Sequence, residues 1–472
     1  MKTNFAVEKY LMLYMPWLLA LILKSDPQLS YMIAWLGSFF IFYLTLSGTV
    51  KPLPGDLSVG EQLMRPILLV QIVFAGYMCC STIFYFLDVL GYENFHKTSP
   101  YYLVDYDLLQ RTAQCQRYYC LGHAAFVTGI LMFMKYPEKG GHKYFIDNEK
   151  IANLLLLTAC ITLPLSYLFL NISGLSQFAN QFTALSFISG TLALALAIPL
   201  KKIWNTLTCL ILYFFNFYQA LISGFKEPII ISILVLGVFL YPHYKRLVLI
   251  IFIPVILSLF ILLPAYNRAF RENAWGGQAN TEEATQLALD AALNKNSTQG
   301  SDESNWGFLA FRLSEIDMFT HFVQSTPEKV DFYHSQLLEQ SVIALIPRIF
   351  WASKPITENM VMERVYAAGV INRNSTVSAK PAFIVDAYLS YGSVGIFFFL
   401  LIYGALAQLI SIKAEKLFGG YILGTALIFS GLFQIMWRGL SFEFIINTLF
   451  WSYISMLIFQ KILIAARVLK TV

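Results

Sequence analysis

Twelve apolar runs, each nearly free of charged residues, constrain the fold of this 472-residue chain more than any other feature. A helix needs about 20 apolar residues to cross a lipid bilayer. The runs are residues 8–23, 31–49, 66–90, 117–134, 151–170, 179–199, 203–221, 228–241, 247–264, 386–411, 418–436 and 443–465. Charged residues make up only 13% of the chain, against roughly 25% in soluble domains. We therefore expect an all-α polytopic membrane protein with about 12 transmembrane helices.

The distribution of Lys and Arg predicts how these helices are oriented. Basic residues are retained preferentially in short cytoplasmic connections. An arrangement with both termini in the cytoplasm places most basic residues of the short connections inside. It leaves only Lys24, Lys97, Arg111, Arg117, Lys226 and Arg438 in short external connections. The chain then divides into membrane helices over 1–264, one long external loop over 265–385, and membrane helices over 386–472. Helical periodicity predicts short helices in that loop at 282–293, 308–323 and 336–346.

Charge and cysteine content exclude two classes of function. The net charge of +5 is mild and no long basic run is present, so we expect no nucleic-acid partner. The six cysteines form no CxxC or Cys/His pattern, so we expect neither a metal site nor a cofactor. The lipid bilayer itself is the first expected partner.

Basic residues recur near span ends on the predicted outer side. A single such residue usually extends to the lipid headgroups, which is the simpler interpretation for each. Here five separate segments supply them, against the general bias for positive charge inside. If they converge, they form a site for an anion, and a lipid-linked diphosphate is the natural anion at that depth. The residues are Lys226, Arg268, Arg271, Arg312, Arg348, Lys354 and Arg438.

The segment Pro347 to Pro355, with the pattern PRxFWxxKP, is the most specific string in the chain. Proline fixes φ and lacks a backbone donor, so neither proline suits a helix interior. We expect a rigid, non-helical stretch that presents Arg348, two aromatic rings and Lys354. An interfacial aromatic anchor is the alternative interpretation.

This string, preceded by Asp331-Phe332-Tyr333, resembles the periplasmic signature of Wzy-type O-antigen and oligosaccharide repeat-unit polymerases. Three further elements follow the family order. Gly224-Phe225-Lys226 is similar to its Gly-Ser-Arg element, with Lys where the family has Arg. The run from Pro381 through Asp386 to Gly395 resembles its return from loop to membrane. Tyr118 to Gly129 resembles its early glycine-containing span, so the resemblance covers roughly residues 110–440.

The resemblance implies a fold like that of the O-antigen ligases and polymerases, which is GT-C-like. It implies a glycosyltransferase that polymerises undecaprenyl-diphosphate-linked oligosaccharide repeat units into surface polysaccharide. The expected location is the periplasmic face of the bacterial inner membrane, with no metal. The expected partners are the lipid-linked oligosaccharide, a chain-length-regulating co-polymerase and a flippase. The product could be O-antigen, as part of lipopolysaccharide, or capsule or exopolysaccharide.

Such chemistry needs positive charge for the departing diphosphate and a base for the acceptor hydroxyl. Arg348 is the expected catalytic cation. If residues 308–323 form one helix, Arg312 lies on its apolar stripe, and Glu315 lies about 60° away and one turn from it. Glu315 is therefore the first candidate base and Asp386 the second, although a structural ion pair with Arg312 remains an alternative for Glu315. Asp317 and His321 face away as a solvated pair. Weaker candidate bases are Glu358 and Glu363, and the aromatic residues available for sugars are Tyr333, Trp351, Tyr366 and Tyr388.

Two other functions stay open at this stage. A ligase that transfers glycan to a lipid core uses the same chemistry. A flippase or transporter of lipid-linked sugars also fits twelve spans, but it predicts charges within several spans and short loops at both faces. The largely uncharged spans and the single long loop favour chemistry at the outer face.

Overall fold

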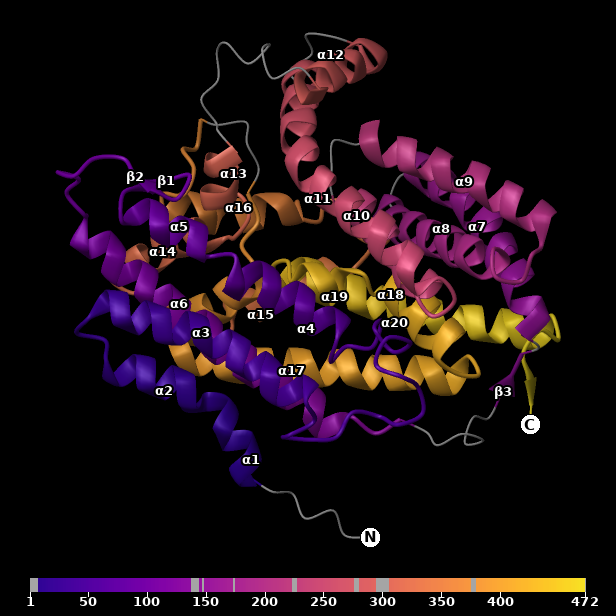
Figure 1. The fold of residues 1–472 in the computed structure, drawn as a ribbon, viewed down its shortest axis with the longest axis horizontal. Helices are drawn as coiled ribbons and strands as arrows, with labels where there is room; N and C mark the ends of the chain where they lie inside the picture. Colours follow the sequence, from indigo (N-terminus) through magenta and orange to yellow (C-terminus); the bar gives the residue numbers. More distant parts are fainter. Residues whose placement is uncertain are drawn as a thin grey trace.

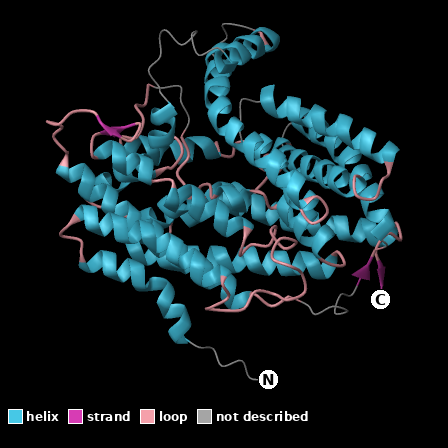
Figure 2. Ribbon diagram, viewed as in Figure 1, coloured by secondary structure: helices cyan, strands magenta, loops and turns pink. Residues whose placement is uncertain are grey.

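A computed structural model describes residues 7–136, 144–146, 148–172, 175–222, 227–275, 280–293, 305–374 and 379–471. Helices form almost all of the regular structure, as Figure 2 shows. Each of the twelve apolar segments predicted from the sequence overlaps one or more of these helices. The helical class predicted from the sequence is therefore confirmed.

The first half of the described chain contains eleven helical segments and three short strands. They are α1 (Val7–Leu11), η1 (Met12–Tyr14), α2 (Met15–Ile22), α3 (Pro27–Leu46), α4 (Leu69–Phe74), η2 (Ala75–Cys80), α5 (Ile83–Val89), β1 (Tyr92–Glu93), β2 (His96–Lys97), α6 (Tyr106–Phe133), β3 (Tyr144–Phe145), α7 (Asn148–Asn171), α8 (Ser176–Ala197) and α9 (Ile203–Ile222).

The second half is again helical, apart from one strand at its end. Its elements are α10 (Glu227–Leu240), α11 (Lys245–Phe270), η3 (Arg271–Trp275), α12 (Thr281–Leu293), α13 (Asn305–Phe311), α14 (Ile316–Ser325), α15 (Gln336–Leu345), α16 (Thr357–Ala367), α17 (Phe383–Leu417), η5 (Ile422–Phe429), α18 (Ser430–Leu432), α19 (Ile435–Arg438), α20 (Phe442–Ala465) and β4 (Lys470–Thr471). Strands β1 and β2 pair antiparallel, as do β3 and β4.

Seven helices of the described chain are long and apolar enough to cross a membrane. They span Pro27–Leu46, Leu69–Val89, Lys150–Asn171, Phe178–Ala197, Ile203–Ile222, Phe383–Leu417 and Phe442–Ala465. Two shorter apolar helices cover Ile229–Leu240 and Ile422–Leu432. The protein is thus a helical membrane protein by its architecture.

Helices α3 and α6 begin at aspartates that cap them. The Asp26 carboxylate accepts the backbone N–H of Leu29 at 3.1 Å, and the Asp105 carboxylate accepts that of Leu108 at 3.0 Å. Each cap satisfies a backbone donor that has no partner within the helix, and its negative charge favours the helix start. Helix α6 therefore begins at Tyr106, eleven residues before the apolar run predicted from residue 117.

Helix α17 is the central element, and it runs along the long axis of the molecule with α6 packed along it (Figure 1). The close approach depends on two glycines. A Cβ at Gly129 of α6 would collide with the Leu401 carbonyl oxygen, and a Cβ at Gly404 of α17 would collide with that of Phe126. The two helix backbones are thus in direct contact, which fixes α17 against the core of the bundle.

Helix α17 is kinked after its second turn, at Tyr391 and Gly392. Gly392 adopts φ 61°, in the left-handed region that glycine tolerates best. A segment from the predicted loop docks at this kink. The backbone N–H of Tyr333 donates to the Leu389 carbonyl at 2.8 Å, and that of His334 donates to the Ser390 carbonyl at 3.1 Å. The loop is therefore fastened to the first two turns of α17.

Short helices of the predicted loop gather where α17 begins. Helix α14 packs against α6 and α17, α13 packs against α5, and α15 packs against α20 (Figure 1). We call this end of the bundle, which holds Phe383 together with α13, α14 and α16, the loop end. Helices α12 and α15 lie where periodicity predicted them, and residues 346–356 are non-helical, as the two prolines predicted.

A buried ion cluster closes the other end of α17. Arg65, which is fully buried, donates from two nitrogens to Asp56 at 2.7 and 2.6 Å and from two to Glu415 at 3.1 Å each. It also donates to the Gln62 side chain at 3.1 Å and lies over the Tyr136 ring. This cluster fastens the segment that precedes α4 to the last turns of α17.

Candidate active site at the start of helix α17

The helix predicted over 308–323 is broken in the structure, so the prediction of a single helix was wrong. Helix α13 ends at Phe311 and α14 begins at Ile316, with a bend between them. A continuous helix would have turned Arg312 inward, where a charged guanidinium is costly to bury. The break leaves Arg312 exposed while Ile316 and Phe319 stay in the core. Glu315 and Arg312 are therefore not one turn apart on a common helix.

Glu315, the residue immediately before α14, is placed inward by this break. Its Oε2 atom is buried and has no hydrogen-bond partner. Burial raises the pKa of this carboxyl to about 7, and the backbone N–H of Ala382 partly opposes the shift. Ala382 immediately precedes α17, where the positive end of the helix dipole favours a carboxylate. Glu315 can thus hold or release a proton near neutral pH.

Two further polar atoms near Glu315 lack partners. The hydroxyl of Ser314, the preceding residue, is buried and makes no hydrogen bond. The hydroxyl of Tyr119 on α6 is also buried and unpaired, and it lies within electrostatic range of the Glu315 carboxyl. Unsatisfied buried polar groups are uncommon in folded proteins, and a group of them is typical of a site that binds a ligand or water.

Asp386, the second predicted base, is fully buried one turn into α17. Its Oδ2 atom accepts from Arg364 Nη2 at 2.9 Å and from the backbone N–H of Phe442 at 2.9 Å. Its Oδ1 atom is buried without a partner. Asp386 is therefore held in an ion cluster, with one oxygen still available.

Arg364 on α16 and Glu443 on α20 complete this cluster, and sequence reasoning missed both. Arg364 donates to the two Glu443 oxygens at 2.7 and 2.8 Å, and its Nε is buried without a partner. The pKa of Arg364 is raised, because the two carboxylates outweigh the cost of burial. A signal was present in the sequence: at 100° per residue Arg364 lies 60° from Val361, at the edge of the buried stripe of α16.

Arg348 and Lys354 lie side by side in the non-helical stretch, as predicted, but differ in exposure. Arg348 is exposed, and its Nη2 donates to the Pro355 carbonyl at 3.3 Å. Lys354 is buried, and its Nζ donates to the Ala344 and Ile346 carbonyls at 2.8 Å each. Burial and the charge of Arg348 lower the pKa of Lys354. Lys354 therefore satisfies the carbonyls at the end of α15, whereas Arg348 keeps most of its donors for other partners.

The remaining predicted cations come from different elements. Arg268 lies in the last turn of α11, where its Nε donates to Glu272 at 2.9 Å, and Arg271 opens η3. Arg438 ends α19, although its side chain lies outside the described part. Lys226 lies outside the described residues altogether. Within the described chain, Arg348 and Lys354 are the pair of predicted cations that the structure brings together.

The weaker candidate bases have partners of their own. Asp317, expected to be solvated with His321, instead accepts the Tyr85 hydroxyl at 2.9 Å. Glu363 pairs with Arg373 at 2.7 Å, and Glu358 pairs with Lys380 at 3.1 Å. Two of the four aromatic residues considered for binding sugars also make hydrogen bonds within the protein. Tyr388 is buried and donates to the Thr326 carbonyl, and Trp351 donates to Ser353.

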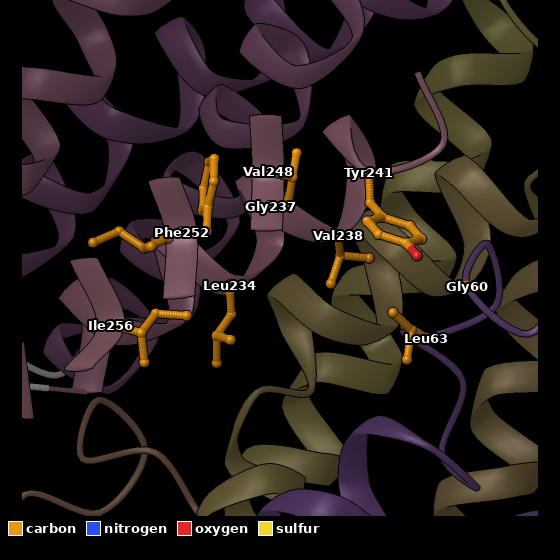
Figure 3. A pocket seen from close by; sticks show the side chains of 10 residues that line it. Gly60, Leu63, Leu234, Gly237, Val238, Tyr241, Val248, Phe252 and Ile256 are labelled. Carbon is orange, nitrogen blue, oxygen red and sulfur yellow. The ribbon is translucent and has the colours of Figure 1, made fainter. Parts of the chain in front are cut away.

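An apolar cavity of about 220 Å³ lies apart from these residues. It is formed by α10, α11 and the segment that contains Gly60 and Leu63, and Figure 3 shows Leu234, Tyr241 and Phe252 around it. Its lining is apolar and includes none of the predicted site residues. Among the described residues, no group of three His, Cys, Asp or Glu side chains could hold a metal ion.

The fold and site together define a helical membrane protein with buried, incompletely paired acids at the loop end. Residues 15–471 match a family described as a domain of unknown function (DUF8712), and the chain belongs to that family. No curated protein matches the chain, and no solved structure matches it.

Proposed function

We propose that this protein is a membrane glycosyltransferase. In this proposal it polymerises undecaprenyl-diphosphate-linked oligosaccharide repeat units into surface polysaccharide at the outer face of a bacterial inner membrane. All twelve apolar segments cross the membrane, residues 265–385 lie outside, and the architecture is GT-C-like. The resemblance of the Pro347–Pro355 segment to repeat-unit polymerases supports the substrate class.

The Glu315 carboxyl is the observation that carries the proposal. A general base works best when its pKa is close to the operating pH. Glu315 has a pKa of about 7 and a buried oxygen without a partner, beside the start of α17. Burial also raises the pKa of Asp386 to about 7 and leaves its Oδ1 without a partner, but its Oδ2 pairs with Arg364. Of these two carboxyls, Glu315 is the one without an ion pair among the described residues, so it is the first candidate.

In the proposed reaction, Glu315 accepts the proton of the acceptor sugar hydroxyl. The hydroxyl oxygen forms the new bond to the anomeric carbon of the donor sugar, and the bond from that carbon to the lipid diphosphate breaks. The diphosphate leaves with the bonding electron pair. Arg348, which makes one long hydrogen bond to the protein, donates to the departing diphosphate, and exposed Arg312 approaches from the α13–α14 bend.

The test of the base is Glu315→Gln, assayed with purified protein and a lipid-linked repeat unit. The change preserves the shape and removes the base, so transfer should fall about 10²–10⁴-fold while substrate still binds. Glu339→Gln, which removes an exposed carboxylate that accepts from the Ser335 hydroxyl, is the matched control and should retain activity. Full activity in Glu315→Gln together with loss in Asp386→Asn would move the base to Asp386.

Arg348→Ala tests the diphosphate contact. Polymer should be lost at an unchanged protein level, and Arg348→Lys should restore only part of it, because lysine lacks the two-pronged guanidinium. Arg373→Ala, which removes an exposed arginine paired with Glu363, is the control. A normal polymer length distribution in Arg348→Ala would remove the central cation from the proposal.

Deletion in the native host separates the related functions. A single repeat unit on the surface identifies a polymerase. Loss of all glycan from the lipid core identifies a ligase, and accumulation of lipid-linked repeats inside the cell identifies a flippase.

A further inference from the structure

Arg117 on α6 is a buried cation without a buried anion. Its side chain is only 8% exposed, and its Nη1 donates to the Ser30 hydroxyl on α3 at 2.8 Å. No carboxylate of a described residue pairs with it, and the ionisable groups that influence it are Tyr118 and Cys115. Burial also excludes the ordinary explanation for an arginine near a span end, which is extension to the lipid headgroups.

Arg111, six residues earlier on the same helix, is in a similar position. It is half-buried, its Nε is buried without a partner, and it makes no hydrogen bond or ion pair with a described residue. The charges of Arg111 and Arg117 both reach the buried thiol of Cys115, which lies between them in the sequence. Two cations without counter-ions are thus concentrated on a short stretch of α6.

Burying a guanidinium without an anion costs several kcal/mol, and a second one nearby adds repulsion. Most buried cations are paired, as Arg65 and Arg364 are in this protein. Two neighbouring cations without counter-ions persist in a stable fold when they bind a partner that the chain itself does not supply. The missing partner must be an anion.

Tyr118 supplies a third donor at this place. Its hydroxyl accepts from the Gln114 side chain at 2.9 Å, so its own proton remains to donate. Arg111 and Tyr118 are seven residues apart and therefore lie on the same face of the helix. The Tyr118 ring also packs against Phe319, one turn after Glu315, at 6.0 Å between centroids. Tyr118, whose hydroxyl lies within electrostatic range of Arg117, thus connects the cations to the helix that follows the candidate base.

The depth of these residues in the membrane limits the kind of anion. Helix α6 has 28 residues, about eight more than a bilayer crossing requires. In the proposed function residues 117–134 of α6 are one of the twelve spans, which places Arg111 and Arg117 at the boundary between hydrocarbon and headgroups. Phosphate groups of lipids lie at this level, and guanidinium groups bind phosphate oxygens in a two-pronged geometry.

We propose that Arg111 and Arg117, with the Tyr118 hydroxyl, form a binding site for a phosphate or diphosphate group at the loop end. The site deepens the proposed function and rests on it for the source of the anion. In the proposed reaction this site holds the diphosphate of a lipid-linked sugar while Glu315 accepts the proton of the acceptor hydroxyl. The same chemistry would also take a free phosphate or an ordinary phospholipid headgroup.

The test measures binding of inorganic diphosphate by calorimetry, with the protein in nanodiscs of phosphatidylcholine. Arg111→Gln and Arg117→Gln should each weaken binding at least tenfold, and Arg117→Lys should weaken it less. Arg373→Gln is the control and should bind as the unaltered protein does. In a second arm the nanodiscs contain polyprenyl diphosphate. If the lipid is the source, it blocks binding of inorganic diphosphate, whereas added phosphatidic acid does not.

Thermal unfolding without ligand separates binding from a structural role. Because no described residue pairs with Arg111, Arg111→Gln should keep or raise the unfolding temperature and lose the stabilisation given by diphosphate. Unchanged diphosphate affinity in both glutamine variants would overturn the site. Intact diphosphate binding together with inactive glycosyl transfer would overturn the proposed function and leave the site standing.

Discussion

Helix α17 carries a buried arginine cluster near each of its ends, and the two clusters have the same charges. Each places one guanidinium between two carboxylates: Arg65 between Asp56 and Glu415, and Arg364 between Asp386 and Glu443. They lie about 40 Å apart along the helix, because Asp386 and Glu415 are 29 positions apart at about 1.5 Å per residue. They differ in how completely their hydrogen bonds are satisfied.

The Arg65 cluster is saturated. The guanidinium donates to Asp56, Glu415 and Gln62, and Glu415 also accepts from Thr425 at 2.8 Å. Asp56 is 23% exposed, so water shares the excess negative charge. The guanidinium lowers the pKa of Asp56, as expected of a carboxylate that stays ionised.

The Arg364 cluster is unsaturated. Asp386 and Glu443 are both fully buried, so their excess negative charge has no water to share it. Arg364 Nε and Asp386 Oδ1 have no partners, and the unpaired Oε2 of Glu315 belongs to the same end of α17. A saturated cluster holds elements together, whereas an unsaturated one keeps groups available for chemistry. The difference supports the proposed site at the loop end.

Arg65→Ala should give the largest loss of stability. Removing one partner of a buried ion pair leaves the other charges uncompensated, at a cost of about 3–5 kcal/mol. Unfolding of the purified protein in detergent, followed by tryptophan fluorescence, measures this loss. Arg373→Ala, at an exposed pair, should change stability by less than about 1 kcal/mol. A small loss of stability in Arg65→Ala would show that a cluster with all its hydrogen bonds made does not for that reason stabilise the fold.

Glu315→Gln should change stability in a pH-dependent way. The folded-state pKa of about 7 lies above the ordinary value of 4.5, so the folded protein favours the protonated form. This stabilisation is fully present below about pH 4.5 and is lost as the pH rises through about 7. The glutamine variant should therefore be more stable than the unaltered protein at pH 8, by up to about 3 kcal/mol, and similar at pH 5. An equal difference at both pH values would contradict the raised pKa.

Lys354→Met should cost about 2 kcal/mol, because it leaves the Ala344 and Ile346 carbonyls without their charged donor. Arg348→Ala, six residues earlier and exposed, should leave stability within about 0.5 kcal/mol. Unfolding temperatures of the two variants in the same detergent make the comparison. An equally large loss in Arg348→Ala would show that Arg348, too, serves the fold rather than the substrate.

The sequence predicted features that depend on local pattern. Apolar runs located the helices, since lipid and core both select them along a single helix. The prolines at 347 and 355 predicted the non-helical stretch. The choice of Glu315 as a base stays a prediction. The reason given for Glu315 was wrong, however, because periodicity could not show that α13 ends at Phe311.

Features that depend on pairing across the chain could not be predicted in the same way. Arg364 and Glu443 are 79 residues apart, and nothing local indicates that they meet. Lys354 was expected to bind an anion, but its distance from the Ala344 carbonyl becomes known only with the fold. The burial of Arg117 against α3 could not be predicted from the sequence either, since an arginine beside an apolar run usually extends to the headgroups.

Asp386→Asn gives the smallest expected change and compares the two clusters most directly. The substitution removes one negative charge from a site that has an excess of it, and the amide oxygen can still accept from Arg364 and from the Phe442 N–H. Stability should stay unchanged or rise by up to about 1 kcal/mol, as is found when surplus buried charge is removed. The matched change Glu415→Gln should lose about 2 kcal/mol, because that carboxylate accepts charged hydrogen bonds in a saturated cluster. Unfolding of both variants at pH 7.5 measures the difference. If Asp386→Asn loses as much as Glu415→Gln, the excess charge at the loop end is already compensated. Both clusters would then be structural, and the unpaired oxygen of Glu315 alone would distinguish the two ends of α17.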